Sequence, residues 1–235
     1  GYVYAQRNQE VYVNLFVAGA GDISVGGHAL KIAQETRYPW DGAVRITVSP
    51  DEPMDFTLCV RIPGWAQGRP VPGDLYRYLN DASEPVSAAV NGTDIALEIE
   101  NGFARIQRTW KSGDTVDLNL PMLVRRVLAH EKIAGDAGRV ALERGPILSC
   151  AEWPDNGGQA LNIILPDDAP LEARYDADLL HGVALIEGRA KGIYRTGDGT
   201  TTEIREQRFL AIPYYAWAHR GEGEMAVWLA RTPET

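Results

Sequence analysis

Acidic side chains are the most numerous groups in this sequence that could carry out chemistry. The chain has 235 residues, of which 32 are Asp or Glu, and glycoside hydrolysis needs two carboxylates that face each other across a cleft. Most of these acids fall in predicted turns or at outward strand positions. Glu143 and Glu152 differ, because each lies within otherwise apolar sequence. Glu152 is therefore the best candidate carboxylate for ligand binding; in a purely structural role it would pair with Arg144 or cap the turn that follows.

Tryptophans at turns form the second group of candidates. Trp40, Trp65 and Trp153 each lie beside Pro or Gly. An indole at such a turn either stacks on a sugar ring or anchors against another domain, and the anchor is our leading interpretation. The candidate ligand-binding residues are therefore Trp40, Trp65, Glu152 and Trp153.

The other reactive residue types do not form a catalytic or metal-binding pattern. Histidine is scattered, without a partner at a spacing that would place two imidazoles on one face, and neither cysteine has a Cys or His at metal-ligand spacing (His28, His130, His181, His219, Cys59 and Cys150). Both cysteines lie in apolar, strand-like runs and are expected to be buried. We assign no catalytic residue, no metal ligand and no cofactor to this chain.

The overall charge disfavours several classes of partner. With 23 Lys and Arg against 32 acids, the net charge is −9 and the pI is near 5.0, which disfavours binding to nucleic acid or to an anionic membrane surface. No run approaches the roughly 18 apolar residues of a membrane-spanning helix. The sequence begins with Gly1-Tyr2 and has no initiator methionine. We therefore expect a piece of a longer polypeptide and assign no localisation.

The elements that position these residues are predicted to be strands, because apolar residues recur with a period of two almost everywhere. In 43–49, for example, Val44, Ile46 and Val48 alternate with polar residues. Glycines and prolines fall between such runs, which is typical of β-sandwiches. The prediction is an all-β protein with two antiparallel β-sandwich domains in tandem, 1–122 and 123–235.

Two segments of the first predicted domain have distinctive patterns. Residues 86–120 are predicted to form a four-stranded antiparallel meander with hairpin tips at Asn91-Gly92 and Asn101-Gly102, since Asn-Gly favours tight turns. Residues 63–85 are predicted to form a long loop, rich in Pro and Gly. Its aromatic residues need a packing partner, and we expect that partner to be another domain.

Seven short segments, taken in order, resemble a known family. Together they resemble the region after the catalytic barrel in the β-L-arabinofuranosidases of glycoside hydrolase family 127 and its close relatives. The segments lie at 12–16 (YVNLF), 38–42 (YPWDG), 61–65 (RIPGW), 120–122 (LPM), 140–146 (VALERGP), 152–156 (EWPDN) and 212–217 (IPYYAW).

The resemblance implies a catalytic (α/α)6 barrel followed by two β-sandwiches. It also implies a zinc ion held by three cysteines and a glutamate in the barrel, with one cysteine acting as nucleophile. Cys59 and Cys150 match none of those motifs, and the resemblance places Gly1 just after an adjacent Cys-Cys pair. Zinc is therefore expected in the absent catalytic domain and not in this chain.

The leading functional hypothesis is an accessory region, inactive alone, that supports the absent barrel of an arabinofuranosidase-like glycoside hydrolase. Its expected partner is that barrel, and a homodimer is left open. One alternative is a carbohydrate-binding module that recognises arabinose-containing glycans through Trp40, Trp65 or Trp153. Another is an enzyme complete in itself, with a carboxylate pair around Glu152.

Overall fold

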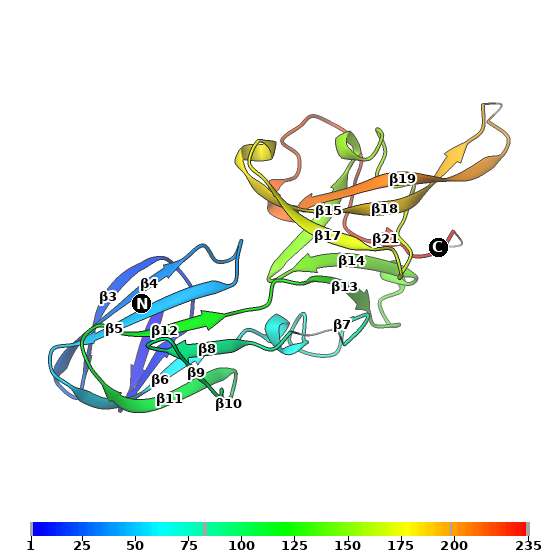
Figure 1. The fold of residues 1–235 in the computed structure, drawn as a ribbon. Helices are drawn as coiled ribbons and strands as arrows, with labels where there is room; N and C mark the ends of the chain where they lie inside the picture. Colours follow the sequence, from blue (N-terminus) through cyan, green and yellow to red (C-terminus); the bar gives the residue numbers. More distant parts are fainter. Residues whose placement is uncertain (1, 82–83, 198, 234–235) are drawn as a thin grey trace. The chain divides into compact units, whose positions relative to one another are not determined.

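The computed structural model describes residues 2–81, 84–197 and 199–233, and strands make up most of its regular secondary structure (Figure 1). Strands account for 53% of the structure and short helical turns for 7%. The helical turns are all of the 3-10 type: η1 (Gly64–Gln67), η2 (Ala134–Asp136), η3 (Trp153–Asp155), η4 (Leu179–His181) and η5 (Tyr214–Ala216). The prediction of an all-β protein is confirmed.

The chain forms two compact units. The first unit comprises residues 1–68 and 83–122, and the second comprises 69–82 and 123–235. The segment 63–85, which the sequence placed wholly in the first domain, is thus divided between the units, and its residues 82 and 83 lie outside the described part. The physical reason is a short strand in this segment that pairs with the second unit.

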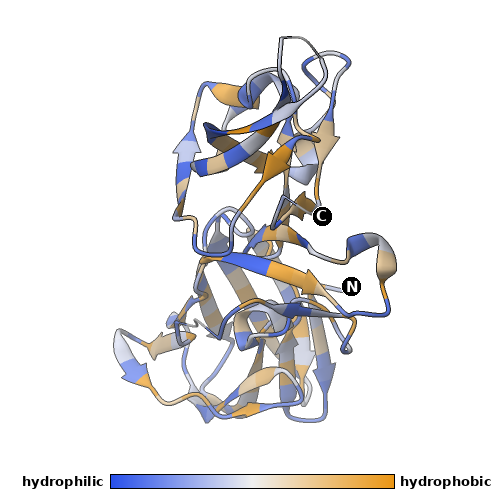
Figure 2. Cartoon of the chain, turned by 90° about the vertical axis from the view of Figure 1, so that its right-hand side faces the viewer, coloured by the Kyte–Doolittle hydropathy of each residue, from blue (hydrophilic) through white to orange (hydrophobic). Residues whose placement is uncertain are grey.

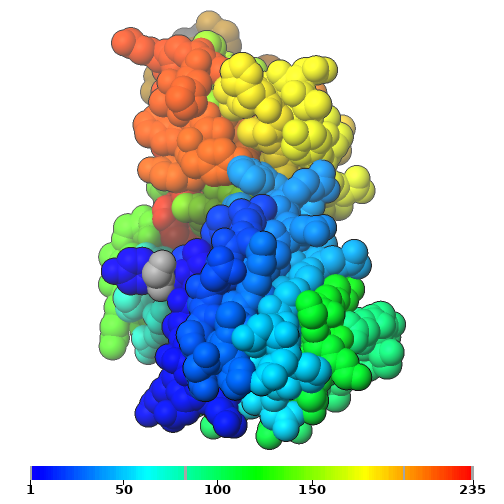
Figure 3. All heavy atoms as spheres, turned by 90° about the vertical axis from the view of Figure 1, so that its left-hand side faces the viewer, coloured from blue at the N-terminus to red at the C-terminus, as the bar shows by residue number. Residues whose placement is uncertain are grey.

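The first unit is a sandwich of two sheets. One sheet has the order β1 (Tyr4–Arg7), β2 (Glu10–Val13), β6 (Met54–Arg61), β11 (Phe103–Trp110) and β10 (Ile99–Glu100). The other has the order β3 (Gly19–Val25), β4 (His28–Thr36), β5 (Ala43–Pro50), β12 (Asp114–Asn119), β8 (Ser87–Val90) and β9 (Thr93–Ile95). In Figure 3 the chain's first strands (blue) form part of the outer surface of this unit.

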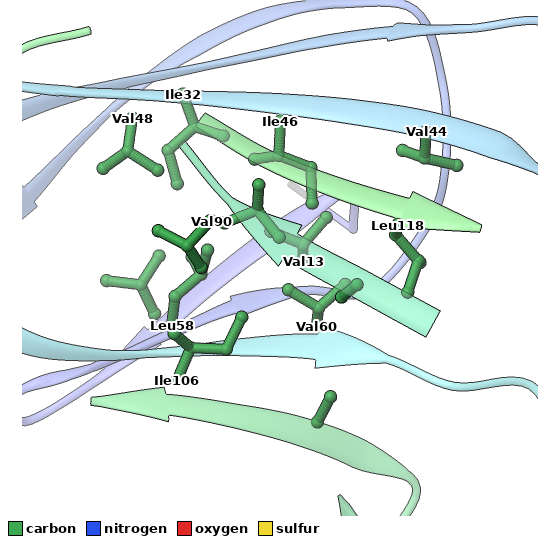
Figure 4. Close-up of a cluster of buried hydrophobic side chains, with 14 of the residues drawn as sticks. Val13, Ile32, Val44, Ile46, Val48, Leu58, Val60, Val90, Ile106 and Leu118 are labelled. Atoms are coloured by element: carbon green, nitrogen blue, oxygen red, sulfur yellow. The ribbon is translucent and has the colours of Figure 1, made fainter. Parts of the chain in front are cut away.

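The core of the first unit lies between its two sheets. Figure 4 shows Ile32, Val44 and Ile46 from one sheet facing Leu58 and Val60 from the other. All five are at most 1% exposed. The alternation seen in the sequence therefore places one face of the central strands in this core, and Figure 2 shows orange and blue bands along the strands.

The region 86–120 forms hairpins but not the predicted meander. Asn91-Gly92 joins β8 to β9 and Asn101-Gly102 joins β10 to β11, all four turn residues having positive φ. The hairpin tips are confirmed. The meander is wrong, because β8, β9 and β12 belong to one sheet whereas β10 and β11 belong to the other. The chain crosses between the sheets after β9 and again after β11.

The second unit is built from one continuous set of strand pairings. Its strands are β7 (Tyr76–Tyr78), β13 (Val124–Ala129), β14 (Arg139–Arg144), β15 (Ile147–Glu152), β16 (Ile163–Ile164), β17 (Leu171–Asp176), β18 (Val183–Arg195), β19 (Thr202–Pro213), β20 (Met225–Ala226) and β21 (Leu229–Ala230). The order β15-β19-β18-β16-β21-β14 closes into a ring, because β14 also pairs with β15. Among the strands of the described residues, two pairings are parallel and not antiparallel: β16 with β21 here, and β2 with β6 in the first unit.

Both faces of the central strands of the second unit are buried. Phe209 and Ala211 of β19 point into the main core, whereas Leu210 and Ile212 join a second cluster that packs against Leu179 of η4. This arrangement explains why residues 209–212 read as a continuous apolar run and not as an alternating one.

Candidate functional site

The most elaborate polar network in the second unit surrounds Glu152, at the end of β15. Glu152 is only 4% exposed. Oε1 accepts a hydrogen bond from the backbone N–H of Ala218 at 2.8 Å, and Oε2 accepts one from Nε of Arg220 at 3.1 Å. Nη2 of Arg220 also pairs with Glu152. Both carboxylate oxygens are therefore engaged.

Arg220 joins Glu152 to a second carboxylate. Its Nη1 donates to Oδ1 of Asp155 at 2.9 Å, and its Nη2 donates to Oδ2 at 2.6 Å. Burial alone would lower the pKa of the Arg220 guanidinium, but the hydrogen bonds to Asp155 and Glu152 outweigh it, and the pKa is raised. Arg220 therefore stays charged and ties the segment after η5 to the turn at 152–155.

Asn156 fixes that turn from the other side. It is 2% exposed. Its Nδ2 donates to the backbone oxygens of Glu152 at 2.8 Å and Leu210 at 2.9 Å, and its Oδ1 accepts from the N–H of Leu210 at 3.0 Å. Each of these buried polar groups has a partner, as a stable buried network requires. The turn is therefore fastened to β19.

This geometry favours a structural role for Glu152. A general acid or base needs an oxygen that can reach a substrate, whereas the oxygens of Glu152 bind Ala218 and Arg220. A buried carboxylate that loses its only cation is strongly destabilising. The network therefore holds the segment 216–220 in place, which is a positioning function.

The four residues singled out from the sequence are divided between the units. Trp40 and Trp65 lie in the first unit, and Glu152 and Trp153 lie in the second. Trp40 is 48% exposed, whereas Trp65 is partly buried against the first core. Trp153 is also partly buried, and its backbone N–H donates to the carbonyl of Glu224 at 3.0 Å.

One side of the Trp153 ring is covered by its own unit. A Cβ added to Gly223 would lie 2.1 Å from Cδ1 of Trp153, so only glycine lets the backbone pass this close to the indole. This contact leaves less of the ring available for a sugar than the sequence implied. Of the three turn tryptophans, Trp40 is the most exposed residue.

The structure also shows a cluster of exposed aromatic residues that our choice of candidates missed. Tyr214, Tyr215 and Trp217 are 42%, 54% and 38% exposed, respectively. They lie in and directly after η5, at the end of β19. The available signal was the concentration of three aromatic residues within four positions after Pro213.

A second buried carboxylate, Glu143 of β14, lies in a different polar cluster. The hydroxyl of Tyr78 donates to its Oε1 at 2.7 Å, and the guanidinium carbon of Arg125 lies 3.9 Å from the centroid of the Tyr78 ring. Burial raises the pKa of Glu143 to about 7, although the Tyr78 hydrogen bond and the Arg125 charge act in the opposite direction. The three residues are each at most 9% exposed.

The two cysteines are buried, as expected, and they lie in different units. Cys59 is 0% and Cys150 is 1% exposed. Burial raises the pKa of both thiols, that of Cys150 to about 12. Within the described ranges, no three His, Cys, Asp or Glu side chains gather closely enough to hold a metal ion. The described residues likewise include no helix that is long and apolar enough to cross a membrane.

Comparisons with known proteins place the chain in a family. Residues 10–122 match the model of the β-L-arabinofuranosidase GH127 middle domain, and residues 124–230 match the glycoside hydrolase family 127 C-terminal domain. The non-reducing end β-L-arabinofuranosidase of Bifidobacterium longum subsp. longum is 32% identical over 250 aligned residues, covering 98% of this chain and 34% of that protein.

Two solved structures show the same fold at higher identity. The GH127 β-arabinofuranosidase BT3674 is 40% identical, with a TM-score of 0.93 over 99% of this chain and 36% of its own. A GH127 β-L-arabinofuranosidase from Geobacillus stearothermophilus T6 is also 40% identical, with a TM-score of 0.85 over 97% of this chain and 35% of its own. The chain thus spans about a third of the length of these relatives. It belongs to glycoside hydrolase family 127, of which it comprises the middle and C-terminal domains.

Proposed function

We propose that this chain is the accessory region of a β-L-arabinofuranosidase, and that it supports a catalytic domain that is not in this sequence. The observation that carries the proposal is the match, in order, to the models of a middle domain and a C-terminal domain, which cover residues 10–122 and 124–230. Relatives at 32–40% identity are arabinofuranosidases of which this chain covers only about a third.

The local chemistry agrees with an accessory role. The buried carboxylate that the sequence favoured, Glu152, has both oxygens bound within the second unit. The zinc site that the family resemblance implies needs three thiolates and a carboxylate. Cys59 and Cys150 do not fit it, because they are buried in separate units and each has a raised pKa. In this proposal, zinc and the nucleophilic cysteine belong to the absent catalytic domain.

A domain-exchange experiment tests the proposal. The last third of the Geobacillus relative is deleted, or replaced by this chain, and hydrolysis of an aryl β-L-arabinofuranoside is measured for each form. We expect the deletion to lose soluble activity, the chimera to recover it, and the isolated chain of 235 residues to be inactive. A matched chimera that carries an unrelated β-sandwich controls for size and solubility.

Two results would contradict this function. The first is full activity of the deletion form, because the accessory region would then support nothing. The second is hydrolysis by the isolated chain that is abolished by Glu152→Gln, which would favour the complete-enzyme alternative. Light scattering on the same samples tests whether the chain forms a homodimer.

A further inference from the structure

An aromatic patch on the second unit has no role in the function proposed above. Tyr214, Tyr215 and Trp217 occupy three of four consecutive positions of the chain, and each of these residues is between 38% and 54% exposed. Single exposed aromatic residues are ordinary on protein surfaces, but a contiguous group of three marks an interaction site.

Two of the rings, those of Tyr214 and Trp217, are stacked on each other, so that each can offer only its outer face and its edge to a ligand. The centroids of Tyr214 and Trp217 are 6.2 Å apart, and the ring planes are inclined by 28°. An aromatic face offers apolar contact to the C–H groups of a sugar ring, while the tyrosine hydroxyl and the indole N–H can hydrogen-bond to sugar hydroxyls. The pair therefore has the chemistry of a carbohydrate-binding surface.

The backbone that carries the rings is held in a strained conformation. Ala218, directly after Trp217, has φ of +67°, which a residue with a Cβ rarely adopts. Such a conformation persists only where the surroundings enforce it. The Ala218 N–H donates to the buried Glu152, and Arg220 is bound by Glu152 and Asp155. The network around Glu152 thus fixes the segment that presents Trp217.

We propose that Tyr214, Tyr215 and Trp217 form a binding platform for neutral, arabinose-containing oligosaccharides, and that Glu152 and Arg220 are its positioning residues. The identity of the sugar rests on the proposed function. Neutral glycans fit best, because Arg220 is neutralised by two carboxylates and the network therefore has a net negative charge. Uronic acids would be repelled.

A small ligand suits this patch better than a folded partner. Stable protein interfaces bury roughly 800 Å² on each side, whereas the patch consists of three side chains on one turn. A stack of one or two sugar rings on Tyr214 and Trp217 needs no more surface than these residues expose.

Isothermal titration of the full chain with arabino-oligosaccharides tests the platform. We expect Trp217→Ala and Tyr214→Ala to weaken binding by about tenfold each, equivalent to about 1.4 kcal/mol, and Trp217→Phe to retain most of it. Tyr175→Ala is the matched control, because Tyr175 is a 64% exposed tyrosine on β17 of the same unit. Glu152→Gln should weaken binding and reduce the quenching of Trp217 fluorescence by sugar.

Four outcomes would overturn the platform. The first is that the wild-type chain binds no sugar although the chimera with the Geobacillus catalytic domain is active. In that case the proposed function stands and the platform is wrong. Binding that survives Trp217→Ala but is lost in Trp40→Ala would place the site in the first unit. Binding affected equally by Tyr175→Ala would be nonspecific. If the wild-type chain binds no sugar and Trp217→Ala abolishes the activity of the chimera, the patch contacts the catalytic domain and not a sugar.

Discussion

At the residue scale, Glu143 is a buried acid whose ionisation affects the stability of the chain near neutral pH. It faces Tyr78 of β7 and Arg125 of β13, and its pKa is raised to about 7 chiefly because burial removes water from the carboxylate. The ordinary value is 4.5. Between these two pH values the folded protein holds a proton that the unfolded chain has released. The stabilisation by protonated Glu143 is therefore complete below pH 4.5 and is lost as the pH rises through 7.

This ionisation predicts a specific effect of Glu143→Gln. Glutamine keeps an oxygen for the Tyr78 hydroxyl but never ionises. The free energy of unfolding of the variant should therefore not show the decrease between pH 4.5 and pH 8, which for wild type is on the order of 3 kcal/mol. We expect the variant to be more stable than wild type at pH 8 and similar to it at pH 4.5, as measured by urea unfolding.

Glu131→Gln, in the exposed turn after β13, is the control for the loss of one acid. It should leave the pH dependence unchanged. If Glu143→Gln retains the wild-type pH dependence, another group is responsible for it, and the assignment to Glu143 is wrong.

A glycine at the start of β5 provides a second residue-scale prediction. Gly42 is buried, and its carbonyl accepts the N–H of Leu120 at 2.9 Å. A Cβ at this position would lie 1.8 Å from the carbonyl oxygen of Leu120, which is backbone and cannot move aside. Gly42→Ala should therefore reduce the free energy of unfolding by about 2–3 kcal/mol. Gly135→Ala, where the added methyl meets open space, should change it by less than about 0.5 kcal/mol. Equal effects in thermal unfolding would contradict this packing argument.

At the element scale, the segment 63–85 serves both units. Trp65 in η1 packs against the core of the first unit, whereas β7 pairs with β13 and places Tyr78 against Val127 in the second. The sequence indicated correctly that these aromatic residues need partners. The chain itself supplies partners for Trp65 and Tyr78, and docking of this segment on another domain stays a prediction.

This division predicts that two substitutions in one segment affect different units. Trp65→Ala should increase hydrogen exchange in strands of the first unit, such as β5 and β6, because it removes contacts with that core. Tyr78→Ala should increase exchange in β13 and β14, because Tyr78 packs on Val127 and Ala141. Each variant is the control for the other. Increased exchange throughout both units in either variant would show that they unfold together, contrary to the prediction.

The sequence predicted features that depend on residues close together in the chain, and it missed features that depend on residues far apart in the chain. The period of two identified which face of β5 is buried, because alternation is a local property. It did not identify which sheet a strand joins, so β11 was predicted to lie beside β12, whereas it pairs with β6 in the other sheet. The apolar surroundings of Glu152 indicated burial, but its cation, Arg220, is 68 positions away. The strand β7 was missed because three residues between glycines and prolines are too few to show a period.

At the scale of the whole molecule, the two family domains and the two compact units do not coincide. The domain models divide the chain after residue 122, whereas the second unit also includes residues 69–82. Within that segment, the N–H of Leu79 donates to the Arg126 carbonyl at 2.8 Å, and the Leu75 carbonyl accepts the N–H of His130 at 2.7 Å. Tyr76 stacks on Trp228 at 5.8 Å between ring centroids. A domain cut at residue 122 therefore removes an edge strand from the second unit.

A fragment consisting of residues 123–235 should consequently be less stable than the same residues within the full chain. Loss of the contacts of Tyr76 and Tyr78 exposes apolar surface around Val127 and Trp228, at a cost of about 1.5–3 kcal/mol for each buried ring. We expect the fragment to melt at least about 10 °C lower and to bind a hydrophobic dye. A synthetic peptide of residues 72–81 should reverse both effects, whereas the same peptide with Tyr78 replaced by Ser should not. If the fragment melts at the temperature of the second unit in the full chain, β7 contributes no stability, and the boundary at residue 122 is a true folding boundary.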